Sequence, residues 1–134
     1  MSAGALVSDA RGLAAVPDRK LGGTRPLAAA LLLRQALEEA LDDFWLGSQP
    51  GMENVSARAQ LVSLPYYLDT ELAGDVTYAW YRLSAICHHD AYELAPSLGE
   101  VLHLAEIVGN LTEHNGDGQA NSLKREPVQA RVPR

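Results

Sequence analysis

The stretch LAAALLLRQALEEALDDFW, residues 27–45, decides the fold of this chain. Its apolar side chains recur every three or four residues, which is typical of one face of an α-helix. These side chains are Leu33, Ala36, Leu37, Ala40, Leu41 and Phe44. Thr24 is a suitable N-cap, Pro26 suits the first turn, and Gly47 marks the end of the helix. Four carboxylates on its polar side could do acid–base chemistry, but adjacent acids on a helix are more typical of a solvated face.

Three more helical segments follow, at about residues 56–68, from 69 or 70 to 92, and 97–112. In the helical segment that ends near residue 92, Val76, Trp80, Leu83 and Cys87 recur at helical spacing. Ala79 and Ile86 widen this apolar stripe. The last segment opens with a capping box, which runs from Ser97 to Glu100. No run of alternating polar and apolar residues indicates a strand. The sequence therefore predicts an all-α domain, a four-helix up-and-down bundle.

The length of 134 residues fits one domain. Residues 1–24 show no clear period, and residues 113–134 are rich in polar residues and helix breakers, so both are expected to be disordered tails. The bundle is then expected at residues 25–112. A domain of this size buries only roughly 60–65% of its unfolded surface. Dimerisation would stabilise it.

Charge is distributed unevenly along the chain. The whole sequence carries −6, whereas residues 25–112 hold four arginines and twelve acids, which gives −8. An acidic domain argues against broad binding along a nucleic-acid backbone, which requires many cations. A small local site around Arg82 remains compatible with this charge.

The sequence also bounds the compartment and the cofactors. Cys87 is the single cysteine, which excludes an intrachain disulfide and suits a core position. The longest apolar run is far shorter than the ~20 residues that cross a bilayer, and the N-terminus lacks a signal-peptide pattern. Without a Cys/His quartet, no metal or other cofactor is indicated. We expect a cytoplasmic protein that does not bind a membrane.

The segment RLSAICHHDAY, from Arg82 to Tyr92, carries the chemistry. Arginine can hold a phosphate with two parallel hydrogen bonds, and histidine can transfer protons near neutral pH. On a straight helix Arg82 and His89 lie roughly 20° apart, whereas Arg82 and His88 lie roughly 120° apart. A structural interpretation competes: Arg82 would pair with a carboxylate such as Asp75 or Glu71, and the histidines would oppose the helix dipole.

The spacing of Arg82 to His88 or His89 resembles the Arg-x4–6-His signature of HEPN domains. An early Leu/Ala-rich helix and a late helix that carries the motif are also similar to that family. The resemblance implies a small, commonly dimeric helical bundle. It further implies a metal-independent endoribonuclease whose two motifs meet across the dimer interface. The family includes toxins, defence nucleases and inactive members that only bind or dimerise.

The resemblance assigns candidate roles to single residues. Arg82, His88 and His89 are the catalytic candidates, and Tyr92 resembles a tyrosine that often follows the histidine. Ser84 and Tyr78 are further candidates for substrate contacts. The implied partners are a second copy of the chain, RNA and a protein such as an antitoxin. The rival hypothesis is a non-catalytic helical dimerisation or interaction module without nuclease activity. It is favoured by the acidic domain and by Leu83, which stands where active members often carry a polar residue.

Overall fold

The computed structural model describes residues 2–15, 24–88 and 96–130 of the chain. These residues form five α-helices: α1 (Ala3–Ala15), α2 (Thr24–Ser48), α3 (Ala57–Ser63), α4 (Thr70–Cys87) and α5 (Leu98–Ala130). Two short 3-10 helices, η1 (Met52–Asn54) and η2 (Leu64–Tyr66), flank α3. No strand occurs in the described ranges, so the predicted all-α class is confirmed.

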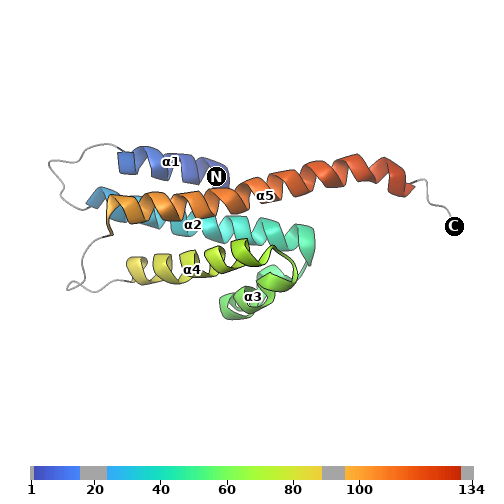
Figure 1. Ribbon diagram of the computed structural model, residues 1–134, viewed down its shortest axis with the longest axis horizontal. Helices are drawn as coiled ribbons and strands as arrows, with labels where there is room; N and C mark the ends of the chain where they lie inside the picture. Colours follow the sequence, from blue (N-terminus) through green and yellow to red (C-terminus); the bar gives the residue numbers. More distant parts are fainter. Residues whose placement is uncertain (1, 16–23, 89–95, 131–134) are drawn as a thin grey trace.

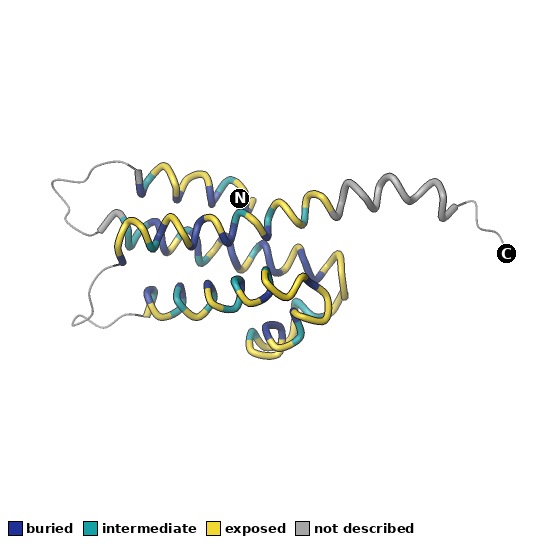
Figure 2. The backbone as a smooth tube through the Cα atoms, viewed as in Figure 1, coloured by how far each residue is buried: buried dark blue, intermediate teal, exposed yellow. Residues whose placement is uncertain are grey.

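The four long helices lie side by side, and the short α3 packs near one end of α4 (Figure 1). Helices α2 and α5 each contact both α1 and α4, so they form the centre of the bundle. Figure 1 also shows that each long helix runs opposite to the long helix before it. Buried and exposed residues alternate along the long helices (Figure 2), and the buried apolar residues of these helices form one core cluster.

The first helix is a correction to the expectation of a disordered tail over residues 1–24. Helix α1 packs against α2 and α5, and it contributes Ala3, Leu6, Val7 and Ala10 to the core. Its start is capped, because the Ser2 hydroxyl accepts the Ala5 N–H at 3.1 Å. The expected four helices thus become five. The segment looked tail-like because alanines and glycines form much of its sequence, yet small residues allow close helix packing.

The last helix also extends beyond its expected end at residue 112. Two of its side chains beyond that point contact α2. The Asn115 amide donates to the Ala40 carbonyl at 2.9 Å, and the His114 ring lies 6.0 Å from the Phe44 ring. The polar composition suggested disorder, but here a polar side chain binds a backbone group of the neighbouring helix. The expected tail boundary at residue 113 therefore lies too early.

Helix α4 begins and packs much as the sequence predicts. The Asp69 carboxylate caps it by accepting the Leu72 N–H at 3.1 Å. Its buried side chains are Ala73, Val76, Ala79, Leu83 and Ile86. Trp80 and Cys87, both predicted as core, are only partly buried. The fully buried part of the predicted stripe is therefore the side that carries Ala79 and Ile86.

Candidate functional site

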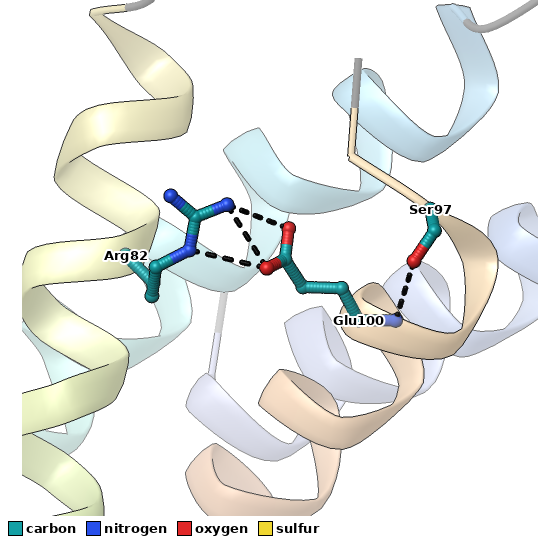
Figure 3. Close-up of polar contacts among 3 residues, drawn as sticks. All are labelled: Arg82, Ser97 and Glu100. Atoms are coloured by element: carbon teal, nitrogen blue, oxygen red, sulfur yellow. Dashed lines mark hydrogen bonds and ion pairs between the residues drawn. The ribbon is translucent and has the colours of Figure 1, made fainter. Parts of the chain in front are cut away.

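Arg82 of α4 forms a two-pronged ion pair with Glu100 of α5 (Figure 3). The Arg82 Nε donates to Glu100 Oε2 at 3.1 Å, and Nη2 donates to Oε1 at 2.8 Å and to Oε2 at 2.9 Å. The Arg82 side chain is 39% exposed and the Glu100 side chain 24% exposed. Such parallel hydrogen bonds are the geometry in which arginine also binds phosphate.

Local structure at the start of α5 places Glu100 in this position. The Ser97 hydroxyl accepts the Glu100 N–H at 3.1 Å, which is the serine half of the predicted capping box. The Glu100 carboxylate is directed to Arg82 rather than back to the helix start. A negative charge in the first helical turn is also stabilised by the helix dipole. Arg82 thus binds a carboxylate, as the structural interpretation expected, but the partner comes from another helix instead of Asp75 or Glu71.

His88 of the motif stands at the end of α4. His88 is the C-cap residue, its backbone N–H donates to the Ser84 carbonyl at 3.0 Å, and its side chain is exposed. His89 and Tyr92 lie outside the described residues. The predicted alignment of His89 with Arg82 therefore stays a prediction.

The two candidate substrate contacts lie on different sides of α4. Tyr78 stands one turn before Arg82 on the side of α5, and its ring lies 6.1 Å from the ring of His103. Ser84 faces α2, where its hydroxyl accepts a hydrogen bond from Arg34 Nε at 3.3 Å. The structure thus brings Tyr78 close to the Arg82–Glu100 pair and directs Ser84 away from it.

The sequence does not predict Glu100, which pairs with Arg82, or His103, whose ring lies near Tyr78, as site residues. Helical periodicity places side chains around one helix, but it does not reveal which residues of another helix face them. The spacing of these residues along the two helices agrees with the observed contacts. Tyr78 and Arg82 are one turn apart on α4, and Glu100 and His103 are nearly one turn apart on α5. Two adjacent antiparallel helices can therefore pair them in register.

A second arginine, Arg34 of α2, makes polar and aromatic contacts between α2 and α4. The Arg34 guanidinium stands 3.9 Å above the centre of the Trp80 ring and pairs with Glu38 of its own helix. Trp80, which packs against the edge of the core, thus makes a cation–π contact with Arg34. Burial raises the pKa of the nearby Cys87 thiol, the Arg34 cation opposes this shift, and the Glu38 carboxylate adds to it. Cys87 is therefore expected to be a poor nucleophile at neutral pH.

The carboxylates of α2 form the polar side that the sequence predicts. Burial, and then the charges of Asp43, Glu38, Glu53 and Glu39, raise the pKa of the Asp42 carboxyl. Within residues 2–15, 24–88 and 96–130, no three His, Cys, Asp or Glu side chains are grouped so that they could hold a metal ion. Among the same residues, no helix is both long and apolar enough to cross a membrane.

The outward face of α4 is exposed and nearly free of charge. It consists of six exposed residues spaced alternately by three and four: Glu71, Gly74, Tyr78, Tyr81, Ala85 and His88. This spacing is the one that two packed helices share along their contact seam. Gly74 and Ala85 are small, and a methyl group added at Gly74 would meet open space. We call this set the α4 seam; Arg82 lies at its edge, on the side of α5.

No family model, no curated protein and no solved structure matches the chain.

Proposed function

We propose that the chain is a homodimeric, metal-independent endoribonuclease of the HEPN type. The observation that carries the proposal is the α4 seam, which ends in the exposed His88 and has Arg82 at its edge. A symmetric dimer of an acidic domain needs a contact surface with few charges, since like charges would otherwise meet. The seam meets this requirement, because only Glu71 in it is formally charged at neutral pH.

The seam also suggests how two copies would align. Ala85 lies midway between Arg82 and His88, three residues from each. In an antiparallel α4–α4 contact with its two-fold axis at Ala85, Arg82 of one copy would stand opposite His88 of the other. The symmetry would create this pairing twice. His89 would lie next to the same position and remains the other candidate for the histidine role.

Each residue would have a distinct role in cleavage. Arg82 would stabilise the charge that develops on the scissile phosphate, and the histidine would take the proton of the 2′-hydroxyl or protonate the leaving oxygen. The 2′-hydroxyl is an internal nucleophile, so its proximity to phosphorus replaces a bound metal. Digestion of single-stranded RNA in excess EDTA tests this mechanism. The expected products carry a 2′,3′-cyclic phosphate, and activity that requires a divalent metal would reject the proposal.

The dimer contact is tested by a cysteine placed at its axis. In a Cys87→Ser background, oxidation of Ala85→Cys is expected to give a covalent dimer at low micromolar concentration. The reason is that a residue on the two-fold axis meets its own copy, and helix packing brings such positions within disulfide reach. The measurement is non-reducing electrophoresis after mild oxidation.

A matched control uses another exposed position away from α4. Gln35→Cys in the same Cys87→Ser background lies on the outward side of α2 and is expected to cross-link far more slowly. Equal cross-linking at both positions would indicate random collision. A monomer mass for the unmodified protein in light scattering would argue against the dimer itself.

A second candidate function is favoured by the Arg82–Glu100 pair. A guanidinium that binds a carboxylate of the same chain can serve simply to join α4 and α5. The chain would then be a non-catalytic dimerisation or interaction module that uses the same α4 seam. This candidate expects a dimer, no RNA cleavage under any metal condition, and no effect of His88 or His89 substitution on partner binding.

A further inference from the structure

We infer that Glu100 is a built-in competitor for the phosphate that Arg82 would bind, so that substrate must displace it. The inference rests on the proposed nuclease function, because it concerns the same arginine. It assigns to Glu100 a regulatory role that the Arg-x4–6-His motif does not contain. Weakly bound anions would not displace the Glu100 carboxylate from Arg82. A well-placed phosphodiester would displace it and bind to Arg82.

The geometry of the pair carries this inference. Nε and Nη2 of Arg82 both donate to the Glu100 carboxylate, at 2.8–3.1 Å, along one edge of the guanidinium plane. A phosphate bound in two-pronged fashion uses the same pair of donors on an arginine edge. The carboxylate and the phosphate therefore cannot occupy this edge together. Glu100 would also repel a phosphate that approached Arg82 from any other direction.

The pair is placed where it can open. Both side chains are partly exposed, so water can solvate Arg82 and Glu100 when they separate. Ion pairs in such positions contribute little to stability, which makes exchange of one anion for another feasible. The Ser97 hydroxyl holds the backbone of Glu100, not its carboxylate, so the side chain can rotate away while α5 keeps its cap. Figure 3 shows that Arg82 and Ser97 contact Glu100 from different sides.

Binding of inorganic phosphate tests the inference without RNA cleavage. The thermal midpoint is measured against phosphate concentration at constant ionic strength, with chloride as the replaced anion. Glu100→Gln is expected to bind phosphate at least about fivefold more tightly than wild type. That factor corresponds to the removal of one unit charge about 4 Å from the bound anion in water. The gain is expected to disappear in the double variant Arg82→Gln/Glu100→Gln.

The control is Glu106→Gln, which makes the same charge change at an exposed position of α5. It is expected to leave phosphate affinity close to that of wild type. An equal gain in Glu106→Gln, a gain that persists without Arg82, or no gain in Glu100→Gln would each overturn the inference. These outcomes are separate from nuclease activity. Absence of RNA cleavage in wild type and in all variants would reject the proposed function. The phosphate titration tests only whether Glu100 competes with phosphate for Arg82.

A wild-type measurement covers the case in which Glu100→Gln does not fold. The Nε–H resonance of Arg82, assigned by its loss in Arg82→Lys, is followed by NMR during titration with phosphate or chloride. Displacement of Glu100 is expected to shift this resonance with phosphate and not with chloride. An Arg82 resonance that is unchanged at saturating phosphate would contradict the inference.

Discussion

Substitution of Arg82 by alanine is expected to slow RNA cleavage by about 10²–10³-fold, because one fixed donor to the developing phosphate charge is lost. Loss of the functional histidine, tested as His88→Ala and His89→Ala, is expected to cost about 10²–10⁴-fold through loss of acid–base catalysis. The measurement is the single-turnover rate on a labelled RNA in excess EDTA. Equal rates in wild type and all three variants would reject the site.

The control for this series is Glu100→Ala. It breaks the same ion pair as Arg82→Ala and is expected to change stability by a similar, small amount, about 0.2–1 kcal/mol. Only Arg82→Ala is expected to lose cleavage. Parallel loss of activity in both variants would indicate that the pair acts through structure rather than through chemistry on the phosphate.

Substitution of Leu6 by alanine is expected to lower the free energy of unfolding by about 2–5 kcal/mol. Leu6 is 1% exposed in α1, so its truncation removes buried apolar surface and leaves a cavity between α1 and its neighbours. Urea denaturation followed by far-UV circular dichroism measures the change. For a domain of this size a loss of that magnitude is a large fraction of total stability.

Leu31→Ala is the matched control, since it makes the same chemical change on α2 at a side chain that is 51% exposed. It is expected to change stability by less than about 0.5 kcal/mol. If Leu6→Ala were as mild as Leu31→Ala, α1 would not be docked on the bundle. The original expectation of an N-terminal tail would then stand.

The sequence predicts the helices whose apolar pattern is strong. The stretch at residues 27–45 forms α2, and the cap predicted at Ser97 accepts the expected backbone N–H group. Helix α4 also begins in the predicted place, because Asp69, one of the two predicted starts, is its cap. These features depend on residues close together in the chain, so local patterns are sufficient to identify them.

Features that depend on contacts between distant segments could not be predicted in this way. Helix α1 has few large side chains, and its packing becomes visible only when α2 and α5 cover it. The polar residues after 112 looked like a tail because the acceptor for Asn115, the Ala40 carbonyl, lies 75 residues earlier. The sequence favours Asp75 or Glu71 of the same helix as the partner of Arg82, whereas Glu100 approaches from α5.

In the candidate site, too, local features could be predicted from the sequence and contacts between distant segments could not. The helical pattern of residues 76–87 is confirmed, but α4 ends at Cys87, earlier than the predicted residue 92, and His88 is its C-cap. The full extent of the α4 seam could not be predicted from the sequence, because tyrosine, alanine and glycine are equally compatible with a buried face. Only the burial of the opposite side of α4 distinguishes the seam as an exposed, weakly charged surface.

The most direct test of a site shared between two chains is a mixing experiment. Arg82→Ala is mixed in equal amounts with His88→Ala or His89→Ala, and subunits are allowed to exchange before RNA cleavage is measured in EDTA. A mixed dimer contains one intact Arg–His pairing and one that lacks both residues, so the mixture is expected to recover about one quarter of wild-type activity. A mixture that stays as inactive as its two separate components would contradict the shared site.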